Sequence, residues 1–267
     1  MQGRLFGGFL MDVRQNGGGL VGRVVGLWRY PVKSMGAEAL TAVDVSWHGL
    51  AGDRRWAFIR NDAPRSGFPW FTLRECSEMS HYRPSFAEPE RPDLSATLVT
   101  SPKGVVRDVF DPALGAELSP GGLRAVKNDR GVFDTFPISL ITTQTIARLG
   151  EMVGATLDVQ RFRPNILVEG ADAAPFLEDT WVGRVLTIGG LRMRVDKRDG
   201  RCVVITIDPV TAIRNPEILR AVAQQRTGQL GVYGTTVAPG RVAINDSVSI
   251  DVGAAATSPV VRTSSGP

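Results

Sequence analysis

Residues 185–196 have the sequence VLTIGGLRMRVD, which indicates the fold class more clearly than any other stretch of the chain. From Leu191 to Asp196, apolar side chains alternate with polar ones, which is the period-two pattern of a half-buried β-strand. The dipeptide Gly189-Gly190 is typical of a two-residue turn and separates this segment from the preceding residues 185–188. These residues therefore predict a β-hairpin.

Strand patterns also occur on both sides of this hairpin. Residues 43–48 alternate between apolar and polar side chains, and a further strand is predicted from Arg55 to Ile59. A second hairpin is predicted where Asn245-Asp246 separates two short alternating segments. Because the strands are short and no regular strand-helix-strand alternation connects them, they favour a barrel or sandwich over a doubly wound sheet.

Two helices are predicted among the strands. One extends from Thr143 to Met152 and ends at Gly154. The other has Asn215 as its N-cap and Pro216 at its first position, and it continues to Gly228. We therefore predict a mainly β (α+β) fold with two β-barrel-like units and a few peripheral helices.

The length of 267 residues fits one large domain or two smaller ones that share an interface. A hydrophobic content of 43% can fill a core of that size. Composition shifts predict the division of the chain. The expected segments are a flexible leader at residues 1–20, a first unit at residues 21–127, a second unit at residues 128–252 and a disordered tail at residues 253–267.

The composition excludes several classes of protein. No apolar run approaches the roughly 18–20 residues of a membrane-spanning helix. The two cysteines, Cys76 and Cys202, are expected to be reduced thiols, which indicates a cytoplasmic protein. Because His48 and His81 are the only histidines, histidine-based metal sites and Ser-His-Asp triads have almost nothing to be built from. The net charge of +4 includes no dense basic run, so nucleic acid is not an expected partner.

Four short polar segments stand between the predicted strands. They are Tyr30-Pro31-Val32-Lys33-Ser34; Gly52-Asp53-Arg54-Arg55-Trp56; Arg161-Phe162-Arg163-Pro164-Asn165 with the later Glu178-Asp179-Thr180-Trp181; and Gly200-Arg201-Cys202 with Ile207-Asp208-Pro209. Together they resemble the MOSC family, named for the C-terminal part of molybdenum cofactor sulfurase, preceded by its N-terminal β-barrel domain. The resemblance extends from about Gly22 to Val252. It implies that residues 21–127 form the N-terminal MOSC-associated barrel and residues 128–252 the MOSC domain.

Within this family the chain is similar to the bacterial and mitochondrial amidoxime-reducing enzymes. The resemblance implies a molybdenum cofactor (Mo-molybdopterin) in a pocket between two barrels, with Cys202 as metal ligand and catalytic residue. A soft thiolate suits a metal already held by dithiolene sulfurs, and the adjacent Arg201 is expected to favour the thiolate. The residues expected to bind the rest of the cofactor are Lys33, Ser34, Arg54, Thr135, Arg163, Asn165, Arg201 and Tyr233. One departure from the family pattern is Ala212, which replaces a glycine after Asp208-Pro209.

The implied activity is reduction of small N-hydroxylated substrates, such as amidoximes, hydroxylamines or N-hydroxylated bases, to amines or amidines and water. Because two cysteines cannot hold an iron–sulfur cluster, electrons are expected from a separate reductase, ferredoxin or small cytochrome. A different function also stays open, in which the chain is a cofactor carrier or a sulfur-transfer module that uses a Cys202 persulfide. A third, nucleic-acid binding, rests only on the isoelectric point of about 9.4.

Overall fold

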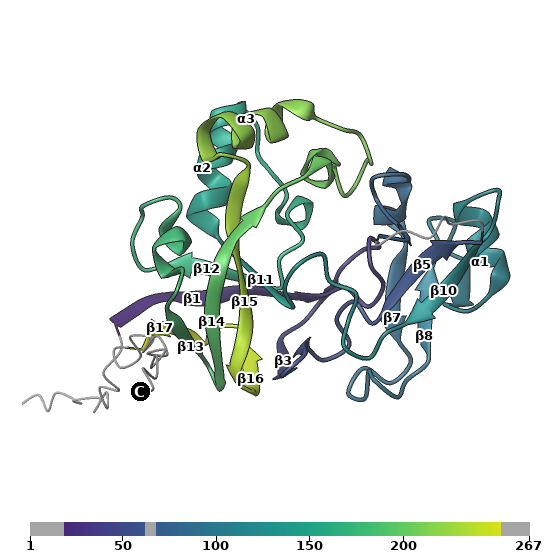
Figure 1. Ribbon diagram of the computed structural model, residues 1–267, viewed down its shortest axis with the longest axis horizontal. Coiled ribbons are helices and arrows are strands. Elements are labelled where there is room, and N and C mark those ends of the chain that lie inside the picture. Colours follow the sequence, from purple (N-terminus) through teal and green to yellow (C-terminus); the bar gives the residue numbers. More distant parts are fainter. Residues whose placement is uncertain (1–18, 62–67, 252–267) are drawn as a thin grey trace, which may run out of the picture.

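The computed structural model describes residues 19–61 and 68–251, and Figure 1 shows a barrel beside a second group of strands. The predicted leader, apart from Gly19 and Leu20, and the predicted tail at residues 253–267 lie outside the described residues. Within the described ranges the chain is mostly strand with three α-helices, so the prediction of a mainly β fold is confirmed. Four short 3-10 helices are η1 (Ser77–His81), η2 (Val159–Arg161), η3 (Leu177–Trp181) and η4 (Val203–Thr206).

Seven strands close into a barrel, drawn at the left of Figure 1. In order around the barrel they are β12 (Ile166–Gly170), β11 (Ile138–Thr142), β15 (Gln229–Ala238), β14 (Leu191–Gly200), β13 (Val185–Ile188), β17 (Ser247–Ile250) and β1 (Gly19–Arg29). β1 then pairs with β12 and completes the ring. Neighbouring strands are antiparallel, except that β11 and β12 run parallel.

Strand β1 closes the barrel because its eleven residues are enough to pair with two neighbours. Its first half pairs with β17 and its second half with β12, and the register shifts twice, between Leu20 and Gly22 and between Val24 and Gly26. Such irregularities bend a strand and increase its twist. At Gly26 a side chain would collide with the ring of Trp28, so glycine is needed for the indole to lie against the strand. The closing strand thus comes from the start of the described chain.

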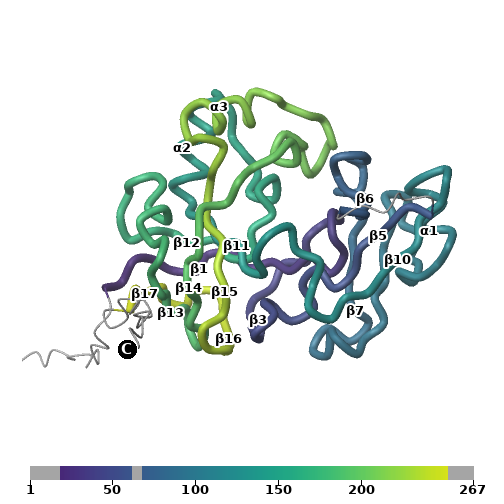
Figure 2. The backbone as a smooth tube through the Cα atoms, in the orientation of Figure 1, coloured from purple at the N-terminus to yellow at the C-terminus, as the bar shows by residue number. Residues whose placement is uncertain are grey.

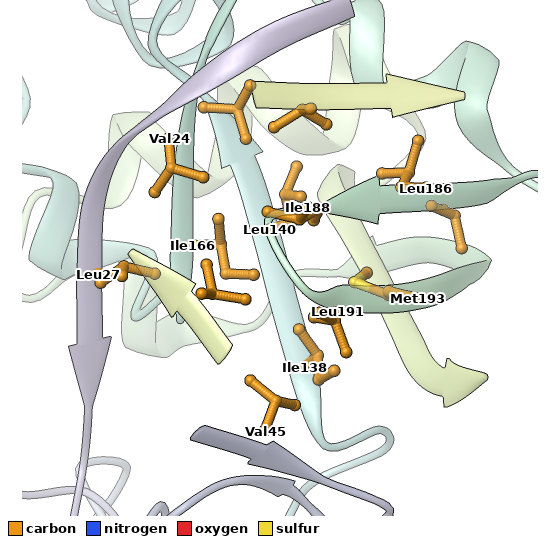
Figure 3. Packing of buried hydrophobic residues seen from close by; sticks show 14 of the residues in the cluster. Val24, Leu27, Val45, Ile138, Leu140, Ile166, Leu186, Ile188, Leu191 and Met193 are labelled. Atoms are coloured by element: carbon orange, nitrogen blue, oxygen red, sulfur yellow. The ribbon is translucent and has the colours of Figure 1, made fainter. Parts of the chain in front are cut away.

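Apolar side chains from alternate strand positions fill the barrel, as Figure 3 shows. Leu186 and Met193 lie opposite each other in the β13–β14 hairpin, and both are fully buried. Val24, Leu140 and Ile166 contribute fully buried side chains from other strands of the same core. The hairpin predicted from residues 185–196 is therefore confirmed, with its apolar positions facing inward.

The other strands form small three-stranded sheets. These are β10 (Leu123–Lys127), β5 (Trp56–Arg60) and β6 (Trp70–Phe71); β7 (Arg83–Phe86), β8 (Thr97–Thr100) and β9 (Val106–Asp108); and β16 (Gly240–Ala243), β3 (Ala42–Ser46) and β4 (Gly49–Leu50). The first two sheets and helix α1 (Pro112–Leu118) surround a second hydrophobic core, at the right of Figure 1. The third sheet joins a late strand to two early ones, and the two-residue strand β2 (Glu38–Ala39) pairs with the end of β1.

Helices α2 (Thr143–Val153) and α3 (Pro216–Arg226) confirm the two predicted helices, and Figure 2 shows them beside each other. Gly154 ends α2 in the left-handed conformation, with φ 64°. The side chain of Asn215 caps α3 by accepting a hydrogen bond from the backbone N–H of Glu217 at 3.1 Å. The two helices share a hydrophobic cluster with the barrel residue Ile141.

The second predicted hairpin, around Asn245-Asp246, is wrong. β16 pairs with β3, and β17 pairs with β13 and β1, so the two strands diverge. The backbone of Val24 in β1 explains the divergence, because it donates to the carbonyl of Asp246 at 2.9 Å and accepts from the N–H of Asn245 at 2.8 Å. A distant strand therefore uses the hydrogen bonds that a local hairpin would have made.

The closed barrel predicts a large difference between two leucine truncations. Leu140→Ala empties a fully buried position and should lower the free energy of unfolding by about 2–5 kcal/mol. Leu94→Ala is the matched control, because that side chain is 78% exposed, and it should change the value by less than about 0.5 kcal/mol. Urea denaturation followed by circular dichroism measures both values. Equal effects of the two substitutions would contradict the described core.

Candidate functional site

A pocket opens where the barrel meets the second group of strands. Its walls come from the loop after β1, the turn before β5, the segment between η2 and β12, the junction of β14 with η4, and β15. Among the sequence-predicted residues, those that line this pocket are Lys33, Ser34, Arg54, Arg163, Asn165, Arg201, Cys202 and Tyr233. Thr135 does not line it, although both neighbours, Asp134 and Phe136, do. The fold thus gathers residues that are far apart in the sequence.

Three of these residues have left-handed backbones, which is unusual for residues other than glycine. The φ angles are 69° at Ser34, 51° at Arg54 and 50° at Arg163. Each such conformation costs roughly 1–3 kcal/mol and persists only where surrounding contacts enforce it. At Arg54, a backbone hydrogen bond of 2.7 Å to the carbonyl of Tyr30 is one such contact. Strain of this kind concentrates where side chains must be aimed at a ligand.

Two of the arginines stack on one buried tyrosine. The guanidinium carbons of Arg54 and Arg163 lie 4.6 Å and 4.2 Å from the centroid of the Tyr30 ring. The Tyr30 hydroxyl donates to the carbonyl of Pro164 at 3.2 Å, which fixes the ring. Burial lowers the pKa of Arg163 to about 10, so its guanidinium is still charged at neutral pH. The buried carboxylate of Asp53 accepts from Arg54 at 2.5 Å, which leaves an excess positive charge here.

Asn165 is fully buried, and its side-chain amide forms hydrogen bonds to other parts of the protein. Its Oδ1 accepts from the backbone N–H of Ser139 at 3.1 Å and from Arg54 at 3.3 Å. Its Nδ2 donates to the carbonyl of Trp28 at 3.2 Å. Asn165 therefore positions Arg54 and ties β1 to the start of β12.

Arg201 forms a second buried cationic group in the pocket wall. Its Nε donates to the carbonyl of Leu230 at 2.7 Å and its Nη1 to that of Phe162 at 2.8 Å. The same Nη1 lies 2.9 Å from a carboxylate oxygen of Asp199, in an ion pair that lacks good hydrogen-bond geometry. Burial raises the pKa of Asp199 to about 6, although the positive charge of Arg201 acts in the opposite direction.

Five buried polar atoms of pocket-lining residues have no hydrogen-bond partner within the described ranges. Four can donate, namely Nε of Arg161, Nη2 of Arg163, Nη2 of Arg201 and the hydroxyl of Ser139, and the fifth is the acceptor Oδ2 of Asp199. A buried donor that lacks a partner costs about 1–3 kcal/mol, and more when it is charged. The four donors therefore suit a ligand that brings several acceptor oxygens or ring nitrogens into the pocket.

Cys202 is half-buried in the pocket wall. The cation that contacts its thiol is the guanidinium of Arg74. The Nη2 atom of Arg74 is 3.5 Å from Sγ of Cys202 and 3.8 Å from a carboxylate oxygen of Asp134. Asp134 also accepts from Lys33 at 2.5 Å. Sequence reasoning expected this role for Arg201 and missed Arg74, Asp134 and Ser139. Asp134 was adjacent to a predicted residue, which is the signal that could have identified it.

Other residues from the motifs of the sequence analysis have structural roles. Glu178 is fully buried and accepts from the hydroxyls of Thr142 and Thr145 at 2.8 Å and 2.9 Å, below the start of α2. Trp181 is part of the barrel core. Ala212, at the position of the family glycine, has φ 59°, and its N–H bonds to the carbonyl of Asp208 at 2.8 Å. The turn therefore forms without glycine, at the cost of a strained alanine.

Two family models match the sequence. The MOSC domain matches residues 127–249, and the MOSC N-terminal beta barrel domain matches residues 21–104. Together the two matched ranges cover most of the chain.

Curated relatives match this chain only over part of their own length. Molybdenum cofactor sulfurase of Danio rerio is 42% identical over 77 residues, which are 28% of this chain and 9% of that protein. Mitochondrial amidoxime reducing component 2 of Rattus norvegicus is 39% identical over 80 residues, 30% of this chain and 22% of that protein. Molybdenum cofactor sulfurase of Caenorhabditis briggsae is 24% identical over 242 residues, 79% of this chain and 32% of that protein. The chain thus spans about a third or less of these relatives.

The buried Asp199 predicts how stability depends on pH. Its pKa of about 6 exceeds the value near 3.9 expected in the unfolded chain, so between these values the folded protein binds more protons. Stability should therefore fall as the pH rises from 4 to 6.5, by about 2–3 kcal/mol relative to the variant Asp199→Asn. Urea denaturation of the apoprotein across this range measures the difference. Asp129→Asn is the control, since that side chain is 81% exposed. Parallel curves for wild type and Asp199→Asn would contradict the prediction.

Proposed function

Since this chain belongs to the MOSC family, we propose that it is a molybdenum-cofactor-dependent oxidoreductase that reduces N-hydroxylated compounds. The substrates are amidoximes, hydroxylamines or N-hydroxylated bases, and the products are amidines or amines and water. Each reduction breaks one N–O bond and consumes two electrons and two protons. The relatives named as mitochondrial amidoxime reducing components support this reaction class.

The observation that carries the proposal is the set of buried donors beside an accessible thiol. The unpartnered Nη2 atoms of Arg163 and Arg201 line the same pocket as Cys202. A pterin cofactor with a terminal phosphate has the anionic and polar atoms that these donors lack, so the residues fit the group. A thiolate is also a ligand that a molybdenum centre accepts readily.

The predicted residues fall into groups with different proposed roles toward the cofactor. Lys33, Arg54 and Arg163 hold the phosphate and pterin through charged donors, and Ser34 adds a hydroxyl. Asn165, Arg201 and Tyr233 complete the predicted set within the pocket, and Cys202 would ligate the metal. Thr135 also belongs to the predicted set, although only its neighbours Asp134 and Phe136 line the pocket. When bound, the cofactor supplies a metal that changes oxidation state and exchanges an oxygen atom with the substrate. The protein would orient this group in the pocket that Cys202 lines.

Electrons are proposed to arrive from a separate donor, which is a reductase, a ferredoxin or a small cytochrome. Both cysteines of the chain are free thiols, in agreement with the proposed location in the cytoplasm of a bacterium. None of the helices in the described part of the chain has the length and apolarity needed to span a bilayer.

A second candidate function is transfer of sulfur or of the cofactor itself, with a persulfide on Cys202. The specific observation in its favour is the alignment with a molybdenum cofactor sulfurase over 79% of this chain. This function needs a thiol that exchanges sulfur, and it does not need stable retention of the metal.

The proposal predicts the metal content of three proteins expressed in a host that makes the cofactor. Wild type should contain close to one molybdenum per chain and release an equal amount of oxidised pterin. Cys202→Ala removes the metal ligand and should lower molybdenum well below wild type, by about tenfold or more. Elemental analysis and pterin fluorescence measure these quantities. Cys76→Ala is the matched control, because the Cys76 side chain does not line the pocket.

Loaded wild type should also reduce benzamidoxime with a chemical electron donor, and Cys202→Ala should not. Wild type that contains neither molybdenum nor pterin would contradict the proposal. Trapping of a persulfide at Cys202 in that protein would establish the sulfur-transfer function in its place.

A further inference from the structure

A second pocket adjoins the first. The two pockets share a wall made of Leu73, Arg161, Arg163 and Val204. The second pocket does not include Cys202, Lys33, Arg54 or Tyr233 among its lining residues.

Arg161 gives the second pocket a buried cation with an unused donor. The side chain is only 9% exposed. Nη1 donates to the carbonyl of Thr206 at 3.0 Å, and Nη2 donates to the carboxylate of Asp208 at 2.5 Å. Nε is buried and has no partner in the described part of the chain. A guanidinium that is held rigidly at one end and unsatisfied at the other suits an anionic acceptor such as a phosphate oxygen.

The rest of the pocket wall combines an aromatic face with a second cation. The half-buried indole of Trp28 lines the pocket, and its ring rests against Gly26, which fixes its plane. Arg83 is exposed at the rim. Gly36 and Ala37 also line the pocket, and the side chain of Arg83 lies directly against Gly36. A flat ring can stack on the indole while a phosphate lies against the guanidinium groups.

We propose that this second pocket binds a nucleotide, with the base on Trp28 and the phosphate between Arg161 and Arg83. The inference goes beyond the proposed function, because Cys202 does not line this pocket, although Arg163 lines both pockets. The nucleotide comes either from solution or as an extension of the cofactor in the first pocket. Both sources present the same ring and phosphate to these residues.

Calorimetric titration of the full-length apoprotein with AMP, GMP, CMP and inorganic phosphate tests the proposal. At least one nucleotide should bind more tightly than phosphate. Trp28→Leu removes the stacking face and should weaken that binding by about tenfold or more. Ala37→Phe fills the pocket from another wall and should weaken it similarly, so the result does not rest on one variant. Arg23→Gln is the control, since its side chain is 54% exposed and lies outside both pockets.

Acid treatment of the holoprotein, followed by analysis of the released products, distinguishes the two sources of the nucleotide. Release of a nucleoside monophosphate in equal amount to pterin would show that it is attached to the cofactor. Its absence, with Trp28-dependent binding to the apoprotein, would show a free nucleotide. Three results would overturn the proposal: no nucleotide binding in either assay, nucleotide binding no tighter than phosphate, or binding that Lys33→Gln abolishes and Trp28→Leu leaves unchanged. Molybdenum content is measured separately, so failure here leaves the proposed function standing.

Discussion

The stacking of Arg54 and Arg163 on Tyr30 is the interaction on which the site depends. Tyr30 follows the barrel strand β1, Arg54 precedes β5 of the second group of strands, and Arg163 precedes the barrel strand β12. One buried carboxylate, that of Asp53, binds both the backbone N–H of Tyr30 at 2.7 Å and the guanidinium of Arg54. Separate parts of the chain therefore meet at a single charged cluster, and the pocket lies beside it.

Forming this charged cluster raises the free energy of the folded protein. Buried guanidinium groups lose their hydration, and the left-handed backbones at Arg54 and Arg163 add roughly 1–3 kcal/mol each. Arg54 and Arg201 each pair with a buried carboxylate, that of Asp53 and that of Asp199, whereas Arg163 forms no ion pair within the described residues. An anionic ligand would relieve the excess charge and stabilise the folded state by an amount that grows with the logarithm of its affinity. The site is thus built for a ligand before the ligand arrives, and the large barrel core offsets the cost.

Local patterns predicted the parts of the fold whose hydrogen bonds are local. The hairpin at residues 185–196 and the cap at Asn215 depend on neighbouring residues, so the sequence alone identified them. The hairpin predicted at Asn245-Asp246 failed because β1, more than 200 positions earlier, pairs at that place. Alternation of side chains cannot show which distant strand will pair with a given strand. The boundary between the two units, placed after residue 127, stays a prediction.

All but one of the residues that the family motifs predicted line the pocket, but the motifs could not rank their roles. Asn165 and Arg201 use most of their polar atoms within the protein, whereas Arg74, which the motifs did not single out, is the cation at the thiol. Thr135 was predicted in place of its neighbours Asp134 and Phe136, which line the pocket. Such differences of one residue depend on loop backbone angles, which a sequence pattern does not specify.

X-ray absorption at the molybdenum edge tests the central claim, that the thiol of Cys202 completes a metal centre held in this pocket. The account predicts one more sulfur neighbour at single-bond distance in wild type than in Cys202→Ser, in which an oxygen takes its place. An identical sulfur count in the two proteins would contradict it.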